Sequence, residues 1–358
     1  MTFKKRNILI VSPSLNVGGI GRHLSVFAES FNNMGHEVKM LSCLNEKKFY
    51  KVSDDIEVHR FPHKRKRGII GKISFYPLLI SYIRKKIRDI RPDFILVFGD
   101  LFNPLVLLSA LGTNIPVFIG DMTSPDYDYG KLHRILKKVL YPQSAGIVCQ
   151  TKFAETYKKK EFGNKINTIV LDNPIREVQE HDVDKENIIL YVGRFAREKA
   201  PDRLIKAFSL MEDKQGWKLV MAGDGPMLEE MKALAASLGV KEETSFLGKV
   251  KNLDKLYAKA SIYVLPSVLE GFPNALCEAM IAGLPVVCFD GFPSDEIINN
   301  GHDGIIIKNG DIEELSLQLK RLMNDEELRQ KLGNNAKEIR SRLDKEKITR
   351  TLLSFMEK

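Results

Sequence analysis

The chain has 358 residues, of which 44% are hydrophobic and 28% are charged, as in an ordinary globular protein. At about 100–200 residues per domain, this length predicts two domains. The composition excludes disordered, collagen-like and coiled-coil classes, because a sizeable core is available and no low-complexity block is present. The longest mostly apolar run, 69–83, is too short to cross a bilayer, which needs about 20 residues.

Positive charge is concentrated in the first half of the chain. Residues 1–175 hold 28 Lys and Arg against 15 Asp and Glu, whereas residues 176–358 hold 27 against 31. Of the total net charge of +9, the first half therefore carries +13 and the second half −4. This asymmetry indicates an anionic partner for the first half, and nucleic acid, anionic lipid and a phosphorylated substrate all remain open.

The four cysteines are Cys43, Cys149, Cys277 and Cys288, which form no CxxC pair and mostly occupy apolar stretches. We therefore expect neither a zinc site nor a disulfide, and a reducing, cytoplasmic compartment. The first residues run directly into a strand-like segment without an apolar leader, so no signal peptide is expected.

Short apolar runs alternate with helical patterns from the N-terminus onward. The run at 7–12 is followed by a glycine-rich turn at 18–21, a helical pattern and a second run at 37–41, and this order is typical of a parallel sheet. The pattern continues with strands expected at 93–98, 115–119, 145–149 and 168–171 and helices at 72–90, 103–111, 131–141 and 151–160.

The second half repeats this alternation after a break. A polar stretch without periodicity follows the turn signal Asn173-Pro174 and predicts a domain linker at 176–186. Beyond it, strands are expected at 188–192, 218–222, 244–247, 262–265 and 285–289 and helices at 201–211, 226–238 and 312–356.

These patterns predict an α/β protein with two Rossmann-like, doubly wound domains that face each other across a cleft. The domains are expected at 1–175 and 187–340, followed by a C-terminal helix, 341–358, that packs back on the first domain. Ligands bind such sheets outside the carboxyl ends of the strands, so the loops at that edge are where functional residues are expected.

The most informative motif spans 265–280, where a buried strand ends and a helix begins. Glu270 and Gly271 lie in the loop, and Pro273 suits the first helical position, where no N–H is needed. Glycine lets the backbone approach a ligand closely, and a helix N-terminus favours a phosphate. Glu270 and Glu278 flank this anion site as acceptors for sugar hydroxyls. The alternative is an ordinary helix with acidic residues near its N-terminus.

A second motif, 191–201, follows the first strand of the second domain. Its Arg194 and Lys199 are spaced to clamp a diphosphate and stabilise it as a leaving group in place of a metal ion. The alternative is a solvated basic loop, and Arg197 is expected to face solvent. A third loop, 222–226, again ends a strand and begins a helix, as a nucleotide-lining loop or a plain helix-entry turn would.

Together these motifs resemble those of the family 4 retaining glycosyltransferases, which have the GT-B fold. The resemblance covers residues 187–310 and rests on the joint order of Val192-Gly193-Arg194 with Glu198-Lys199, Ala222-Gly223-Asp224-Gly225-Pro226, Phe246-Leu247-Gly248, Leu265-Pro266-Ser267, Glu270-Gly271-Phe272-Pro273 to Glu278-Ala279, and Ala282-Gly283-Leu284-Pro285-Val286-Val287. Gly18-Gly19 resembles the N-terminal turn of the family more weakly.

The resemblance implies a nucleotide-sugar donor bound by the second domain and an acceptor bound by the first. It implies that Arg194 and Lys199 bind the donor diphosphate, that Glu270 contacts sugar hydroxyls as a catalytic residue, and that Glu278 accepts from the ribose. The further donor-binding residues that it implies are Gly18, Gly19, Gly193, Gly223, Gly248, Lys249, Val250, Gly271, Phe272, Pro273 and Asn274.

One position departs from the family pattern. Many members carry a histidine near the reacting sugar, and the matching loop here, after Ile119, has Asp121 instead. Asp121 is therefore a catalytic candidate that contacts a sugar hydroxyl or the developing positive charge of the ring. The alternative is an aspartate that caps the turn.

Neither a metal nor another cofactor is expected, because the family usually works without a metal and Asp126-Tyr127-Asp128 is too isolated to count as a metal motif. The histidines show no metal-ligand spacing. His23, on the helix after Gly21, is expected at the surface, and the alternative is that it faces the cleft. The run Lys158-Lys159-Lys160 is expected to be the solvated end of a helix.

Two basic clusters, 63–67 and 84–88, bracket the apolar stretch 69–83, which contains Phe75, Tyr76 and Tyr82. A basic, aromatic-bearing segment of this kind suits the surface of an anionic membrane. The alternative is a half-buried helix with solvated charges. Nucleic acid is not expected as a partner, because no module known for reading it is recognised.

We therefore expect a retaining, metal-independent glycosyltransferase that moves a hexose or N-acetylhexosamine from a nucleoside-diphosphate sugar. UDP is the family's common choice, and a membrane-associated glycan or polyprenyl-diphosphate-linked glycan is the expected acceptor. The resemblance places such enzymes in the assembly of bacterial capsule or lipopolysaccharide, in the cytoplasm or peripherally on the cytoplasmic face of the plasma membrane.

Other functions fit the sequence less well. A GT-B nucleotide-sugar epimerase needs acids and bases that cannot be assigned here. A non-enzymatic nucleotide-sugar-binding protein would not need the intact set of Arg194, Lys199, Glu270 and Glu278. A dehydrogenase is disfavoured, because the first glycine turn is not GxGxxG and no acidic residue ends the second strand.

Overall fold

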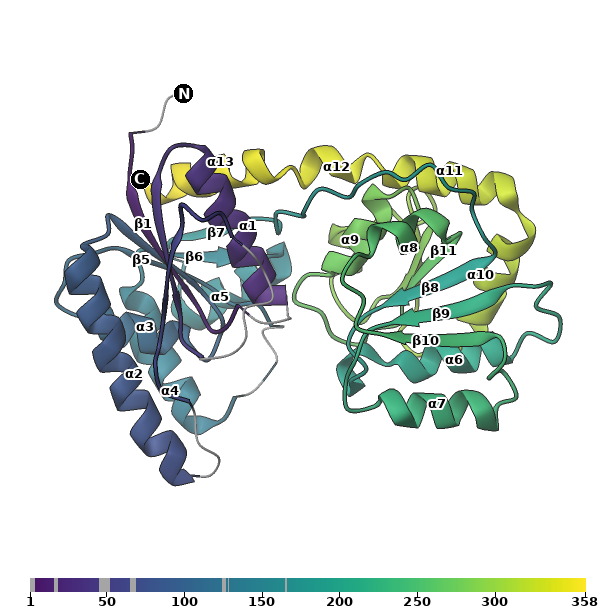
Figure 1. Cartoon of the computed structure of the whole chain (residues 1–358), viewed down its shortest axis with the longest axis horizontal. Coiled ribbons are helices and arrows are strands. Elements are labelled where there is room, and N and C mark those ends of the chain that lie inside the picture. The colour runs from purple at the N-terminus through teal and green to yellow at the C-terminus, as the bar shows by residue number, and fades with distance from the viewer. Residues whose placement is uncertain are drawn as a thin grey trace. The chain divides into compact units, whose positions relative to one another are not determined.

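The structure, a computed structural model, describes residues 4–15, 19–44, 52–64, 69–123, 127, 129–164 and 166–358. The chain divides into two compact units (Figure 1). Unit 1 comprises Met1–Ile175 and Leu343–Lys358, and unit 2 comprises Arg176–Arg342. Each unit is built on a parallel β-sheet, so the predicted α/β, doubly wound class is confirmed.

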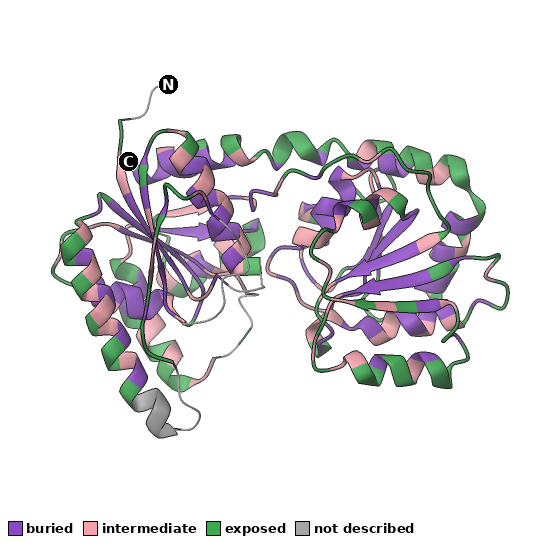
Figure 2. Ribbon diagram, viewed as in Figure 1, coloured by how far each residue is buried: buried purple, intermediate pink, exposed green. Residues whose placement is uncertain are grey.

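The sheet of unit 1 has the strand order β3-β2-β1-β4-β5-β6-β7, and every pair is parallel. Its strands are β1 (Asn7–Ser12), β2 (Glu37–Ser42), β3 (Glu57–Arg60), β4 (Phe94–Phe98), β5 (Val117–Gly120), β6 (Gly146–Cys149) and β7 (Thr168–Val170). The central strands are buried on both faces, as continuous apolar runs predict (Figure 2). Strand β3 was not predicted, because Glu-Val-His-Arg contains only one apolar residue.

Helices cover both faces of this sheet. They are α1 (Gly19–Asn33), α2 (Ile69–Ile90), α3 (Asn103–Ala110), α4 (Lys131–Leu140), α5 (Lys152–Phe162) and α13 (Lys345–Met356), with a short 3-10 turn at Tyr141–Gln143. On one face, Phe27 and Phe31 of α1 pack with Leu352 and Leu353 of α13. On the other face lie α2 and α3. The last helix of the chain therefore completes the core of its first unit (Figure 1).

The sheet of unit 2 has the order β10-β9-β8-β11-β12-β13, again parallel throughout. Its strands are β8 (Ile188–Val192), β9 (Lys218–Ala222), β10 (Thr244–Gly248), β11 (Ile262–Leu265), β12 (Val286–Phe289) and β13 (Ile305–Ile307). Its helices are α6 (Pro201–Ser209), α7 (Leu228–Ser237), α8 (Asp254–Lys259), α9 (Asn274–Ile281), α10 (Ile312–Asn324), α11 (Glu326–Ala336) and α12 (Ile339–Arg342), with 3-10 turns at Arg197–Lys199 and Ser294–Glu296. Strand β13 and helix α8 are too short to give a sequence signal.

The aromatic residues between the two basic clusters of unit 1 belong to the core. Phe75 is 4% exposed and packs edge-on against Phe61, and Tyr82 is half-buried against the same ring. Leu79 and Ile83 on the same face of α2 are fully buried. The helix thus follows the half-buried alternative, and its apolar face is not available to a membrane. Of the first basic cluster, residues 65–67 lie outside the described residues.

Among the described residues, no helix is both long enough and apolar enough to cross a membrane. The Pro77-containing helix α2, with 22 residues, carries too many charges for such a span.

Replacing Leu352 by alanine tests the dependence of unit 1 on α13. The side chain is fully buried among residues of α1 and the sheet. The Leu352→Ala variant should lose about 2–5 kcal/mol of unfolding free energy, because a cavity replaces buried methyl groups. Denaturant unfolding followed by far-UV circular dichroism measures this. The neighbouring exposed Thr351→Ala serves as control, and equal stability of the two variants would contradict the role of α13.

Candidate functional site

The sequence-predicted donor residues of unit 2 lie in loops at the carboxyl ends of β8, β9, β10 and β11. Backbone hydrogen bonds join these loops, from Gly193 N to Ala222 O (3.0 Å), Phe195 N to Asp224 O (3.1 Å), Gly223 N to Gly248 O (2.8 Å) and Val268 N to Glu198 O (3.0 Å). The loops therefore form one connected edge at the switch between β8 and β11, where open parallel sheets bind ligands.

Gly223 is required by this packing. Its φ of 147° disfavours any side chain, and a Cβ atom would lie only 1.8 Å from the carbonyl oxygen of Gly193. At Gly225, with φ of 159°, a Cβ would lie 2.3 Å from the Phe195 carbonyl. The glycines of this loop thus allow two strand-end loops to touch, which is a structural reason for them independent of any ligand.

Two of the predicted catalytic residues of unit 2 form an ion pair. Lys199 Nζ lies 2.6 Å from Glu270 Oε2, and the side chains are 24% and 7% exposed, respectively. Lys199 ends the 3-10 turn after β8, whereas Glu270 follows β11, so residues 71 positions apart meet at the switch point. Arg194 is exposed on the same loop as Lys199, and Arg197 is exposed as expected. The site thus presents a lysine paired with a nearly buried carboxylate, and an exposed arginine on the same loop as the lysine.

The loop before α9 is tightly folded. Phe272 and Pro273 are buried, and the N–H of Asn274 donates to the carbonyl of Phe272 (3.0 Å). Helix α9 begins at Asn274, so Pro273 precedes the helix by one residue and does not occupy its first helical position as predicted. The amide of Asn274, one of those expected to meet the sugar or phosphate, is therefore already bonded within the loop. Gly271 is half-buried.

Glu278 is 1% exposed on α9 and is held from two sides. The Tyr257 hydroxyl donates to Glu278 Oε2 (3.1 Å), and Arg176 Nη2 lies 3.5 Å from the same oxygen. Arg176 also forms an ion pair with Asp254. Arg176 and Tyr257 were not identified from the sequence. Arg176 was placed in the linker, and Tyr257 lies in α8, a short helix that was not predicted.

The loop after β10 carries an exposed ion pair. Lys249 is exposed, and its Nζ lies 3.2 Å from Asp224 Oδ2. The hydrogen bond from Lys249 lowers the pKa of Asp224. An exposed pair of this kind adds little stability, so Lys249 remains able to change partners. Gly248 has φ of 63°, and Val250 is half-buried.

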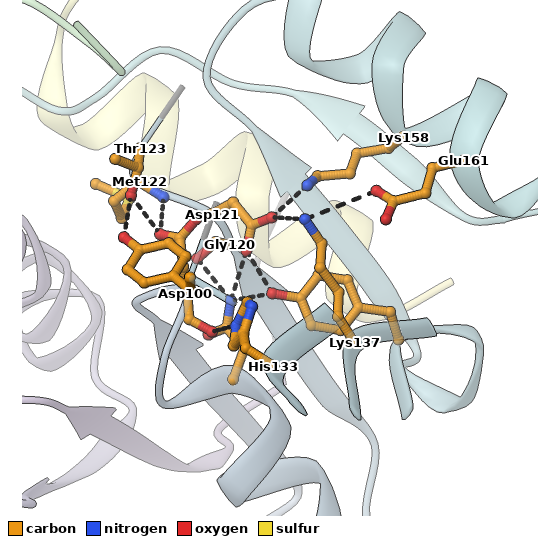
Figure 3. A network of polar contacts seen from close by, with 12 residues as sticks. Asp100, Gly120, Asp121, Met122, Thr123, His133, Lys137, Lys158 and Glu161 are labelled. Carbon is orange, nitrogen blue, oxygen red and sulfur yellow. Dashed lines mark hydrogen bonds and ion pairs between the residues drawn. The ribbon is translucent and has the colours of Figure 1, made fainter. Parts of the chain in front are cut away.

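A polar network occupies the corresponding edge of unit 1 (Figure 3). Strands β4 and β5 are both followed by Asp, at Asp100 and Asp121. Asp121 forms ion pairs with Lys158 and, at 3.3 Å, with Lys137. It also accepts hydrogen bonds from the Tyr141 hydroxyl and, at 3.0 Å, from Asn103 Nδ2. Burial alone would raise the pKa of Asp121, but the charges of Lys158 and Lys137 outweigh it and hold the pKa well below its usual range.

The pKa of Asp100, which is 7% exposed, is shifted in the opposite direction. Burial, followed by the negative charge of Asp121, raises its pKa to about 7. Its carboxylate accepts from Met122 N (3.0 Å) and Thr123 Oγ1 (2.8 Å), and His133 Nε2 donates to its carbonyl oxygen (2.8 Å). One of two neighbouring carboxyl groups is thus fixed as an anion while the other exchanges its proton near neutral pH.

Two expectations for unit 1 are wrong. Lys158 is 1% exposed on the inner face of α5 and is not part of a solvated helix end, because Asp121 compensates its buried charge. A sequence signal for this burial exists. Lys158 lies four residues after Ala154 and four before Phe162, and both of these residues pack against the core.

His23 is 5% exposed and not at the surface, and burial lowers its pKa to about 3. Its ring stacks on Phe27 and lies beside Phe98. The nearby Gly19 begins α1 and is exposed, whereas Gly18 lies outside the described residues, as do Asp126 and Asp128. Within the described ranges, no cluster of three or more His, Cys, Asp or Glu side chains could hold a metal ion.

Comparison with known proteins covers nearly the whole chain. Residues 17–176 match the family described as "Glycosyltransferase Family 4", and residues 172–339 match "Glycosyl transferases group 1". The two matches meet at the boundary between the units, so each unit corresponds to one of them.

Full-length relatives are found in Campylobacter jejuni. One is a GalNAc-α-(1→4)-GalNAc-α-(1→3)-diNAcBac-PP-undecaprenol α-1,4-N-acetyl-D-galactosaminyltransferase, 28% identical over 340 residues, which are 92% of each chain. Another, 27% identical over 361 residues (96% of this chain and 97% of the relative), is an N-acetylgalactosamine-N,N'-diacetylbacillosaminyl-diphospho-undecaprenol 4-α-N-acetylgalactosaminyltransferase.

Solved structures share the fold at lower identity. Sucrose-phosphate synthase from Thermosynechococcus elongatus matches with a TM-score of 0.83 at 16% identity, over 98% of both chains. Anabaena HepE in complex with UDP matches with a TM-score of 0.78 at 17% identity, over 98% of this chain and 99% of that one.

Replacing Lys158 by methionine should strongly destabilise unit 1. The change leaves the buried Asp121 carboxylate without its nearest counter-charge, at a cost of about 3–5 kcal/mol. Chemical denaturation measures the loss. Lys159→Met is the control, because Lys159 is 38% exposed and forms only a helix-surface pair with Glu155. Adding Asp121→Asn to Lys158→Met should recover part of the loss, and strictly additive effects would contradict the coupling.

Asp100 should give unit 1 a pH-dependent stability. The folded-state pKa of about 7 lies above the unfolded value of 3.8, so the native protein holds a proton that the unfolded chain has released. Stability contributed by this proton is complete below the unfolded pKa and is lost as pH rises through the folded pKa, by at most about 1.4 kcal/mol per pH unit.

Asp100→Asn removes this dependence. Between pH 5 and pH 7 the stability of the variant should therefore rise relative to the unsubstituted protein, and above about pH 8 the difference should be constant. Denaturant unfolding at several pH values measures it. A difference that does not change with pH would show that Asp100 titrates normally.

Proposed function

The chain belongs to glycosyltransferase family 4 and has the GT-B fold, and from this premise we propose that it transfers a hexose or N-acetylhexosamine to a lipid-linked glycan. The donor is a nucleoside-diphosphate sugar, with UDP as the nucleotide, and unit 2 binds it. The acceptor is a polyprenyl-diphosphate-linked or other membrane-associated glycan of a bacterial surface polysaccharide, and unit 1 binds it. Retention of anomeric configuration follows from the family.

The observation that carries the donor assignment is the joined loop edge of unit 2. It presents the partly exposed Lys199 beside the nearly buried Glu270, and the exposed Arg194 on the same loop as Lys199, at the switch point of a parallel sheet. A diphosphate is the anion that two flexible cations at such an edge bind well. The 2.6 Å pairing with Glu270 holds the Lys199 ammonium in place before the donor arrives, which reduces the entropy cost of binding.

In the proposed reaction, the acceptor hydroxyl oxygen bonds to the anomeric carbon on the face from which the diphosphate leaves. The bond between that carbon and the diphosphate oxygen breaks, and the hydroxyl proton passes to the departing phosphate. Arg194 and Lys199 stabilise the negative charge that develops on the diphosphate, which is the work a metal ion does in other transferases. Glu270 accepts from a sugar hydroxyl through its second oxygen, and Glu278 accepts from the ribose.

The backbone roles follow the same assignment. The loops approach the phosphate and sugar at Gly193, Gly223 and Gly271. The base lies beside Gly248, Lys249 and Val250. The sugar side of the site is formed by Phe272, Pro273 and Asn274. The role in donor binding that the resemblance implies for Gly18 and Gly19 stays a prediction, since Gly18 lies outside the described residues. The contact of Asp121 with the reacting sugar stays a prediction. Four donors already reach its carboxylate, which has about four acceptor positions, so a sugar hydroxyl would have to replace one of them.

The acceptor assignment rests on the relatives and on charge. Both full-length Campylobacter relatives act, by their names, on undecaprenyl-diphosphate-linked sugars. The excess of positive charge in residues 1–175 fits an anionic, diphosphate-bearing acceptor. Membership of a transferase family favours transfer over the epimerase and over simple nucleotide-sugar binding.

Arg194→Ala should lower kcat/KM for the donor by about 10²-fold or more, because a cation that stabilises the leaving group is lost. A thermal-shift screen of UDP-GalNAc, UDP-GlcNAc, UDP-glucose and UDP-galactose first selects the donor. Initial rates are then measured with an undecaprenyl-diphosphate-linked GalNAc acceptor. Arg197→Ala is the matched control, since it removes an exposed arginine from the same loop and should leave the rate within about twofold.

Equal losses in the two arginine variants would contradict the specific role of Arg194. Activity should also persist in EDTA. Complete loss of turnover in EDTA, restored by Mg²⁺, would show that a metal ion and not the basic loop stabilises the leaving group.

A further inference from the structure

Helix α4 of unit 1 carries large apolar side chains that point into solvent. Leu132 is 72% exposed, Ile135 61% and Val139 59%. At about 100° per residue these three positions fall within an arc of about 60°, so they form one continuous stripe along the helix. In Figure 2 the helix is coloured mainly as exposed or intermediate. The exposed leucines of unit 2, such as Leu317, are by contrast single positions.

Positive charge borders this stripe. The α4 sequence, Lys-Leu-His-Arg-Ile-Leu-Lys-Lys-Val-Leu, contains four Lys or Arg residues and no acidic residue. Lys131 and Lys138 are exposed and lie on the same flank of the stripe on a helical projection. Tyr127, 53% exposed, lies just before the helix in the sequence, and its ring is tilted against that of Tyr129. Aliphatic and cationic side chains therefore lie next to each other on the outer face of α4.

The opposite side of α4 is committed to the fold. Leu136 and Leu140 pack against the core. His133 donates to the carbonyl of Asp100 (2.8 Å), and Lys137 pairs with Asp121 (3.3 Å), as Figure 3 shows. The outer stripe consequently cannot turn inward without breaking the polar network of unit 1. Its exposure is a fixed property of the folded chain.

We propose that the outer face of α4, defined by Leu132, Ile135 and Val139 with Lys131 and Lys138, docks unit 1 on an anionic lipid bilayer. Interfacial helices bind with an apolar face in the acyl boundary and lysines at the headgroups, which is the pattern found here. Acidic headgroups complement a helix without any carboxylate, within a half of the chain whose net charge is strongly positive.

This inference deepens the proposed function, on which it rests for the lipid-linked acceptor. It also corrects the location expected from the sequence. In α2, Phe75 is buried and Tyr76 and Tyr82 are half-buried against the core, so we place the membrane-binding surface on α4 and not on α2. Because a single helix of ten residues bears both the docking face and two residues of the site edge, docking would bring that edge to the depth of lipid headgroups.

Vesicle co-sedimentation of the full chain tests the proposal without any donor or acceptor. We expect binding to vesicles of phosphatidylglycerol and phosphatidylethanolamine to be at least about tenfold stronger than to phosphatidylcholine alone, and to weaken with salt. The Leu132→Ser/Ile135→Ser/Val139→Ser variant should lose about tenfold or more of this binding. Lys131→Gln/Lys138→Gln should lose binding to anionic vesicles only.

Leu210→Ser/Leu317→Ser is the matched control, because it removes exposed leucines from unit 2 and should bind like the unsubstituted chain. Circular dichroism checks that each variant is folded. Unchanged binding of the folded triple variant would overturn the proposal. So would a dimer, detected by light scattering, that the triple substitution dissociates, since the stripe would then bind a second copy.

Sugar transfer to a short, water-soluble acceptor separates this inference from the proposed function. The triple variant should keep that activity while losing transfer to acceptors embedded in vesicles. Vesicle binding without any sugar transfer by the unsubstituted chain would contradict the proposed function and leave the docking face supported.

Discussion

All strands of a parallel sheet run in one direction, so their carboxyl ends, and the loops that follow them, meet along a single edge. Both units obey this constraint, and their central strands are too apolar and too deeply buried to carry chemistry themselves. The polar residues that matter therefore collect in strand-end loops: Arg194, Lys199 and Glu270 in unit 2, and Asp100 and Asp121 in unit 1. The sheet and helices of each unit fix the positions of these loops.

Charged side chains are partly exposed at the sheet edge of unit 2 and buried in ion pairs at the sheet edge of unit 1. In unit 2 the two cations, Arg194 and Lys199, stay at least partly solvated, so they remain accessible to an incoming diphosphate. In unit 1 the Asp121 carboxylate is saturated by donors from α3, α4, α5 and the 3-10 turn, and its charge adds to burial in raising the pKa of Asp100. The edge of unit 2 can therefore bind and release ligands, whereas the polar network of unit 1 keeps the same internal hydrogen bonds and ion pairs.

Much of this was readable from the sequence, and the failures have physical causes. Apolar runs gave the buried strands, and the order of glycine and acidic motifs placed the loops of unit 2 correctly. Periodicity alone could not reveal β3, which has one apolar residue, or Lys158, whose charge is buried only because Asp121 meets it from another part of the chain. Pairings such as Lys199 with Glu270 depend on which strands become neighbours, and local sequence does not contain that information.

The placement of α13 affects how the protein is made. Unit 1 needs this helix to complete its core, yet the ribosome synthesises all of unit 2 before it. At about 5–20 residues per second, the first unit waits roughly ten to thirty seconds in an unfinished state while its successor emerges and folds. Nascent chains would therefore expose Phe27 and Phe31 during translation, and a premature stop codon even a few codons before α13 would release a polypeptide that chaperones and proteases recognise as incomplete.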